Sequence, residues 1–328
     1  MEPNQTTNQN ENVKLHDGLV IILLVAVLLI GLLIAFINNK NNHIRIDELK
    51  HPIATTINPF DSIRLSAKAA IVWDMKNKKI IYSHNESEAL PLASLTKVMT
   101  ALTAIELIPD YTTVTISKAF LEEEGDIGLL RDEKWKLKDL FSISLVSSSN
   151  DGVRAIASVA GSVIGAEKLE PMPTDAVMRA RFIHEMNKKA TLIGLKKTHF
   201  ENENGLDKDS TISGAYGSVE DVALLFDYVL RNHNSLLEST RYPRLTLNSL
   251  DNISHNLHNT NTVVNMIPGL LGSKTGFTDL AGGNLAIITD LGLEGPYIIS
   301  VLGSTEEGRF TDIETLVGAT TEYVKNIK

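Results

Sequence analysis

Ser94 and Lys97 are the two residues of this sequence best suited to chemistry. They lie in LPLASLTKVMTALTAIEL, residues 90–107, which otherwise has the pattern of an apolar helix. Residues three apart on a helix are neighbours on one face, so the hydroxyl and the amine can touch. If the surrounding Leu, Val and Met side chains bury the amine, desolvation lowers its pKa towards neutrality. The pair then becomes a nucleophile beside its general base.

The plain alternative for this pair is an ordinary helix, because serine occurs in helices and lysine can extend its ammonium from an apolar face to water. Two observations favour the chemical interpretation. Ser94 is the only serine in the chain with a lysine at the third following position. It also lies near the start of its helix, where unpaired backbone N–H groups favour negative charge.

Two further short motifs follow along the chain. Ser-Ser-Asn at 148–150 lies in a serine run at the end of an apolar helical segment, where polar side chains can project into a cleft. The S-x-N pattern also occurs at 83–85 and 254–256, so alone it is weak. Lys-Thr-Gly at 274–276 is the only K-T-G in the chain, and it lies in a strand-like segment. Glycine there allows close approach of a ligand, although the motif could equally be polar residues before a turn.

The elements that must position these motifs follow from the pattern. Two β-rich runs flank the polar turn MKNKK, as in a hairpin, and residues 93–240 are mainly helical. Residues 137–161 have the pattern of two helices broken by the serine run. Residues 218–232 have the pattern of an amphipathic helix, and Ser218 is its expected N-cap. Strand-like runs return after residue 270, before a final helical segment. The chain is therefore predicted to be an α+β protein whose terminal strands share one antiparallel sheet.

The order S-x-x-K, S-x-N, K-T-G resembles the penicillin-binding protein and serine β-lactamase superfamily. Residues 70–102, 182–207, 217–225 and 272–285 also resemble low-molecular-mass D-alanyl-D-alanine carboxypeptidases, so the similarity covers nearly all of residues 63–328. The resemblance implies a helical cluster packed on a five-stranded antiparallel sheet, with the catalytic cleft between them. It implies no metal and no organic cofactor.

Roles can be carried over by position from that resemblance. Ser94 would be the acylated nucleophile and Lys97 its general base. Ser148 would relay a proton and Asn150 would hold the substrate backbone, while Lys274 would supply positive charge. Thr275 would help to hold the terminal carboxylate, and the backbone N–H groups of Ser94 and Phe277 would form the oxyanion hole. The residues expected to contact substrate are Thr275, Gly276, Phe277 and Thr278.

The function implied is removal of the terminal D-alanine from peptidoglycan pentapeptides, with β-lactams as covalent inhibitors. A DD-endopeptidase that cuts cross-links stays open as an alternative. A class A β-lactamase needs a glutamate in an E-x-x-x-N context, and the nearest candidate, Glu170 in EPMPT, lacks the asparagine. A non-catalytic penicillin-binding sensor is disfavoured because every catalytic position is intact.

Three departures from the family pattern bear on details. The second motif reads SND where GND is usual, and no arginine lies in HNTNTVVNM before the K-T-G. The segment ENENGLD, residues 201–207, replaces the commoner NPxGLD and is expected to alter a loop beside the site.

The domain organisation follows from composition. Residues 1–17 are expected to be a disordered tail, 18–38 a retained transmembrane signal-anchor, 39–62 a linker and 63–328 the catalytic domain. Residues 19–37 carry no charge and are long enough to cross a bilayer, and no small-residue cleavage pattern follows them. Because many family members carry a further C-terminal domain and anchor, this helix is expected to be the tether here.

Charge and residue counts exclude other classes. The chain has no cysteine, and its net charge of -9 argues against nucleic acid as a partner. His184-Glu185 lacks a second histidine at helical spacing and is expected to be surface helix. Lys14 is the only basic side chain before the apolar segment, whereas three follow it up to residue 50, and this count alone would place that later flank in the cytoplasm. Because peptidoglycan lies outside the cell, we instead expect a cytoplasmic N-terminus and an extracytoplasmic domain in a bacterial cell membrane.

Overall fold

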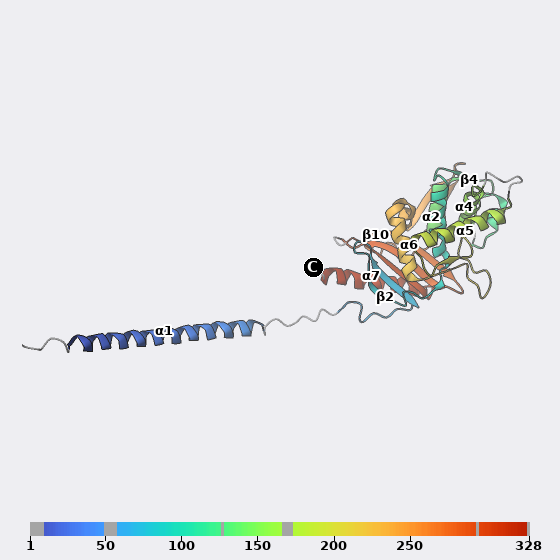
Figure 1. Cartoon of the computed structure of the whole chain (residues 1–328). Coiled ribbons are helices and arrows are strands. Elements are labelled where there is room, and N and C mark those ends of the chain that lie inside the picture. Colours follow the sequence, from blue (N-terminus) through green and yellow to red (C-terminus); the bar gives the residue numbers. More distant parts are fainter. Residues whose placement is uncertain (1–9, 49–57, 126–127, 166–172, 293–294, 327–328) are drawn as a thin grey trace, which may run out of the picture. The chain divides into compact units, whose positions relative to one another are not determined.

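The computed structural model describes residues 10–48, 58–125, 128–165, 173–292 and 295–326 (Figure 1). The chain divides into two compact units, residues 1–57 and 58–328. The second unit begins slightly before the residue 63 expected from sequence, because Phe60 already packs in its core beside Tyr82, at 5.1 Å between ring centroids.

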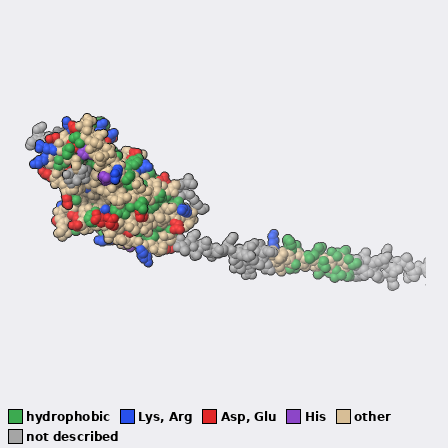
Figure 2. Space-filling view, turned by 180° about the vertical axis from the view of Figure 1, so that it is seen from behind, with side chains coloured by type: hydrophobic (Ala, Val, Ile, Leu, Met, Phe, Trp, Pro, Cys, Tyr) green, Lys and Arg blue, Asp and Glu red, His purple; other side chains and the backbone are tan. Residues whose placement is uncertain are grey.

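The first unit contains one long helix, α1 (Asn10–Glu48). Its segment Val20–Lys40 is apolar and long enough to cross a membrane by length and composition, and its apolar side chains are exposed (Figure 2). The helix includes residues 10–17, expected in the disordered tail, and residues 39–48, expected in the linker. No proline lies between residues 10 and 48 to end it.

A five-stranded antiparallel sheet forms the centre of the second unit, in the order β10-β11-β12-β1-β2. The two ends of the second unit therefore share one sheet, as predicted, and the expected hairpin joins β1 to β2. The strands are β1 (Ala69–Asp74), β2 (Lys79–His84), β10 (Leu270–Thr278), β11 (Gly282–Asp290) and β12 (Pro296–Ser304).

Both faces of this sheet are covered, because successive side chains of a strand point to opposite faces. Ile71 of β1 packs in the core shared with the helical cluster, whereas Val72 packs in a second core with Ile313 of the last helix. The helices are α2 (Thr96–Leu107), α3 (Leu137–Val146), α4 (Asn150–Ser162), α5 (Asp175–Ile193), α6 (Val219–Asn232) and α7 (Gly308–Asn326). Short 3-10 turns are η1 (Ala93–Leu95), η2 (Lys118–Glu122) and η4 (Asn234–Arg241).

Short strands complete the unit and tie the loops to the helical cluster. They are β3 (Leu90–Pro91), β4 (Thr113–Thr115), β5 (Lys134–Lys136), β6 (His199–Phe200), β7 (Ala215–Gly217), β8 (Arg244–Asn248) and β9 (Ser254–His258). The predicted N-cap of α6 is confirmed, because the Ser218 hydroxyl accepts a hydrogen bond from the backbone N–H of Asp221. Asp221 in turn accepts from the Lys196 and Lys197 N–H groups, which fixes the turn after α5.

Candidate active site

Ser94 and Lys97 meet where η1 passes into α2. Lys97 is fully buried, and its Nζ donates to Ser94 Oγ at 2.6 Å and to the Asn204 carbonyl at 3.0 Å. The expected contact between hydroxyl and amine is thus present. The chain bends sharply before Ser94, since Ala93 has a φ of 47°. Gly205 makes room for that bend, because a Cβ there would lie 1.9 Å from the Ala93 carbonyl oxygen.

Burial sets the protonation of this amine. Desolvation lowers the pKa of Lys97 to about 7, and the carboxylates of Glu203 and Glu123 oppose that fall. A lysine in this range exists partly as the free amine near neutral pH and can take a proton from a hydroxyl. The sequence-based expectation of a lysine pKa near neutrality agrees with this environment.

The loop 201–207 supplies contacts that sequence reasoning did not assign. Its two carbonyls at Glu203 and Asn204 accept from Thr100 Oγ1 (2.6 Å) and Lys97 Nζ, so the loop lies along α2. The Asn204 side chain donates to Glu123 Oε2 at 3.1 Å. The departure ENENGLD was the signal that marked this loop as unusual.

A second serine–lysine contact joins the helices to the sheet. Lys274 of β10 is buried, and its Nζ donates to Ser148 Oγ at 3.0 Å and to the Thr275 carbonyl at 2.8 Å. Ser148 has a φ of 62° at the junction of α3 and α4, which are the two predicted helices. Burial, and then the charges of Lys97 and Arg309, lower the pKa of Lys274 well below its usual range.

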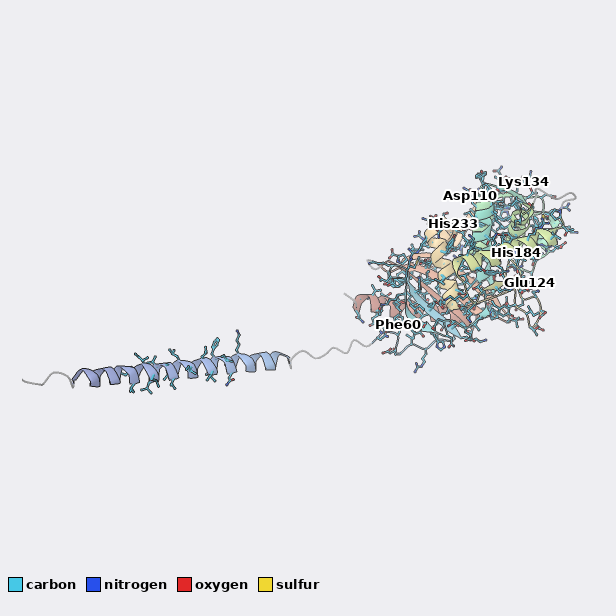
Figure 3. All side chains as sticks on the ribbon, viewed as in Figure 1. Phe60, Asp110, Glu124, Lys134, His184 and His233 are labelled. Carbon is cyan, nitrogen blue, oxygen red and sulfur yellow. The ribbon has the colours of Figure 1, made fainter. Side chains whose placement is uncertain are left out.

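Asn150 lies at the start of α4 and is 9% exposed. Its Nδ2 donates to the Glu124 carbonyl at 2.6 Å, and Figure 3 labels Glu124 on the segment before β5. Its Oδ1 is buried without a hydrogen-bond partner within the described residues. The free oxygen is suited to accept from a backbone N–H of a bound peptide.

Strand β10 runs close to the nucleophile. A Cβ on Gly276 would lie 3.1 Å from the backbone nitrogen of Ser94, so only glycine fits without displacement. Phe277 is 44% exposed beside it. The Gly276 carbonyl accepts from the buried Arg309 of α7 at 2.9 Å.

The remaining expected contact residues are held from neighbouring loops. Thr275 Oγ1 lies 2.5 Å from Thr260 Oγ1, and Thr278 Oγ1 donates to Asp207 Oδ1 at 3.0 Å. Thr260, Asp207 and Arg309 were not identified from sequence. Asp207 lies in the segment 182–207, which resembles the carboxypeptidases, so that similarity could have pointed to it. No motif in the sequence around Thr260 or Arg309 points to a role at the site.

Two other expectations concern residues outside this cluster. His184 is exposed on α5 (Figure 3), which agrees with the surface-helix interpretation. Glu170, weighed as a β-lactamase glutamate, lies outside the described residues. Within the described ranges, no three His, Cys, Asp or Glu side chains are grouped as a metal site.

Comparison with known proteins identifies a matching family and similar sequences. Residues 54–305 match the family of D-alanyl-D-alanine carboxypeptidases. The chain is 27% identical over 266 residues to the D-alanyl-D-alanine carboxypeptidase DacF of Bacillus subtilis, covering 79% of this chain and 59% of that protein. It is also 27% identical over 235 residues to a D-alanyl-D-alanine endopeptidase of Pseudomonas aeruginosa, covering 69% and 68% of the two chains.

Solved structures share the fold. The ampicillin-bound form of penicillin-binding protein D2 from Listeria monocytogenes is 30% identical, with a TM-score of 0.63 over 79% of this chain and 98% of that one. The Streptomyces K15 DD-transpeptidase is 21% identical, with a TM-score of 0.69 over 80% and 98%. These neighbours establish the DD-peptidase fold for the second unit, as the sequence predicted.

Proposed function

The chain belongs to the D-alanyl-D-alanine carboxypeptidase family, and from that premise we propose that it removes the terminal D-alanine from peptidoglycan pentapeptide stems through an acyl-enzyme on Ser94. One observation carries the proposal. The buried Lys97 amine, with a pKa of about 7, lies 2.6 Å from the Ser94 hydroxyl. That is the arrangement of a nucleophile and its base.

The reaction uses this pair in two steps. Lys97 takes the Ser94 proton while Ser94 Oγ bonds to the carbonyl carbon of the D-Ala-D-Ala bond. The developing oxyanion would lie between the N–H groups of Ser94 and Phe277. The close approach of Gly276 to the Ser94 nitrogen supports this arrangement. The proton then passes to the leaving amine, with Ser148 as the relay towards it, and free D-alanine departs. Water next attacks the ester, Ser94 regains a proton and the shortened peptide leaves.

The sheet side of the site binds the substrate carboxylate. Lys274 is buried near Lys97 and Arg309 and has no carboxylate partner of its own among the described residues, so an incoming carboxylate would favour its ammonium form and pair with it. Thr275 would add a hydroxyl contact, and Thr260 fixes its position. Gly276, Phe277 and Thr278 would form the edge of β10 along which the peptide lies. No metal or organic cofactor enters this chemistry.

A second candidate is cleavage of peptidoglycan cross-links, favoured by the similarity to a protein named as an endopeptidase. β-Lactams, which mimic the scissile peptide, would acylate the same serine. The membrane is proposed as the partner of α1, because its apolar segment is exposed and long enough to span it.

The proposed topology is a single pass in a bacterial cell membrane, with a cytoplasmic N-terminus and the catalytic domain outside. Protease treatment of intact cells checks it. Digestion of the C-terminal unit supports the topology, and full protection would contradict both the topology and the peptidoglycan substrate.

The activity test is D-alanine release from a peptide ending in Lys-D-Ala-D-Ala, with the full chain in detergent beside its Ser94→Ala variant. Release by the parent alone supports the proposal. A folded parent that leaves this peptide intact but cuts a cross-linked dimer would move the assignment to an endopeptidase.

A further inference from the structure

Glu203 is a buried carboxylate behind the general base, and the chemistry described so far does not use it. Its side chain has no exposed surface, although it lies directly before Asn204, whose carbonyl accepts from Lys97. Arg179 of α5 reaches it, with Nε 2.8 Å from Glu203 Oε1. Burial raises the pKa of the Glu203 carboxyl, and the charge of Arg179 opposes that rise. A charge this deep in a protein is costly to bury unless it balances other charges.

The charges around Glu203 form a connected network with a net negative sign. Glu123 accepts from Arg154 at 2.9 Å, and Arg154 also lies 3.5 Å from Asp175 of α5. Arg179 also lies 4.0 Å from Asp175, and the more exposed Glu122 lies 4.0 Å from Arg154. Four carboxylates therefore accompany two guanidinium groups, so acidic groups outnumber basic ones in this network.

Two other basic side chains are buried near Lys97. They are Lys274 of β10 and Arg309 of α7, and burial, followed by the charges of Lys97 and Arg309, lowers the pKa of Lys274. With only these neighbours, Lys97 would be free of its proton at neutral pH but would be a poor acceptor. A general base works best when its pKa lies near the operating pH.

We propose that Glu203, paired with Arg179, is a positioning residue that supplies the countercharge which allows Lys97 to accept the Ser94 proton near two other buried basic groups. The inference rests on the proposed function. In the step concerned, the Ser94 O–H bond breaks, a new Lys97 N–H bond forms, and the negative charges of Glu203 and Glu123 stabilise the new ammonium. Asn204 links the two sides, because its carbonyl accepts from Lys97 and its side chain donates to Glu123. The direction in which both carboxylates act on the pKa of Lys97 agrees with this role.

The charge is a feature of this chain and not of the commoner motif. In NPxGLD, proline stands where Glu203 stands in NENGLD, and proline carries no charge. Relatives with that proline must balance their lysine by other means. If removal of the Glu203 charge changes the pH dependence of acylation, that change therefore reports on the charge network of this chain.

The test is the second-order rate of acylation by a fluorescent penicillin, measured from about pH 5 to about pH 9 with the full chain in detergent. Glu203→Gln removes the charge and nearly keeps the shape. The acid limb of the profile is the pH range over which the acylation rate falls as Lys97 becomes protonated. In Glu203→Gln this limb should move to lower pH by about half a unit or more, because protonated Lys97 is no longer stabilised by the Glu203 charge. The maximal acylation rate should also fall. Glu203→Asp keeps the negative charge, so the acid limb of its pH profile should stay where it is in the parent. Glu201→Gln, at a partly exposed carboxylate in the same loop that pairs with Lys208, is the matched control.

An acid limb that stays in place in a folded Glu203→Gln protein, with only a lower rate, would overturn the proposal and leave Glu203 a purely structural residue. If that variant does not fold, the pH profile of Glu123→Gln decides instead. A shift of its acid limb to lower pH would support the proposal, and an unshifted limb would contradict it. Loss of acylation in the parent itself would instead defeat the assignment of Ser94, so the two failures are distinguishable.

Discussion

Two serine–lysine pairs lie in one site, and they differ in what surrounds the lysine. Lys97 lies 2.6 Å from Ser94 Oγ, and Lys274 lies 3.0 Å from Ser148 Oγ. Both amines are buried. Lys97, however, faces the carboxylates of the loop 201–207 and its neighbours, whereas Lys274 faces Lys97 and a buried arginine.

The difference shows that the residue pair alone does not decide the role. A lysine balanced by carboxylates keeps a pKa near 7 and can exchange a proton with its serine. A buried lysine that lies near other basic groups and has no carboxylate partner among the described residues is suited to bind an anionic group of the substrate. Strand β10 also approaches the backbone nitrogen of Ser94, which supports the proposal of an oxyanion hole at the first pair.

The largest effect is expected from Lys97→Met. Without a base, acylation by a penicillin should fall about 10²- to 10⁴-fold, measured by stopped-flow fluorescence at neutral pH. Lys188→Met, on the exposed face of α5, should leave the rate unchanged. A Lys97→Met protein within threefold of the parent would mean that the two pairs have the opposite roles.

A smaller loss is expected from Lys274→Met. A bound carboxylate favours the ammonium form of Lys274. Removal of this amine should therefore lower D-alanine release from a free-carboxylate peptide about 10- to 100-fold, through one lost charge-assisted contact. The same variant should lose little on a peptide whose terminal carboxylate is amidated, because that contact is already absent. Equal losses on both peptides would argue against carboxylate binding.

Gly276→Ala tests the approach of the sheet to the nucleophile. The added Cβ would meet the Leu92 carbonyl at 3.0 Å and the Ser94 nitrogen at 3.1 Å. The resulting shift should lower the acylation rate about tenfold, since catalytic geometry tolerates little displacement. Gly318→Ala in α7, where a Cβ meets nothing within 4 Å, should be neutral. An unaffected Gly276→Ala enzyme would show that this closeness is not used.

The smallest effect concerns stability. The folded pKa of Lys97 is lower than its unfolded value, so its burial costs most below pH 7 and the cost declines as pH rises towards the unfolded pKa. Lys97 should therefore add about 2 kcal/mol of stability between pH 7 and pH 9, with Lys274 acting in the same direction. Denaturant unfolding of the full chain at several pH values measures this, and Lys97→Met should flatten the dependence. A parent that loses stability over that range would contradict the buried neutral lysine.

Sequence reasoning reached those parts of the molecule whose signals are local. Spacing along one helix placed Lys97 beside Ser94, and strand patterns at both chain ends predicted their common sheet. The apolar span Val20–Lys40 lies close to the segment predicted at 18–38, but the extension of α1 into its polar flanks was not predicted, because those flanks lack apolar periodicity and yet contain no proline.

Contacts between distant segments could not be derived in this way. Asn204 meets Lys97 across 107 residues, and Arg309 reaches Gly276 from a helix that carries no motif. The ion network around Glu203 joins several elements, and its charges are unremarkable one by one. Only the fold shows that they gather behind the base.

The most direct test of the account is to find which serine carries the acyl group. The full chain would be acylated with a penicillin, digested with trypsin, and the modified peptide sequenced by mass spectrometry. The account predicts the adduct on Ser94, in the peptide that contains Leu95 and Lys97, and no adduct in a Ser94→Ala variant. An adduct on Ser148 would contradict it, because the pair with Lys274 would then be the one that performs the chemistry.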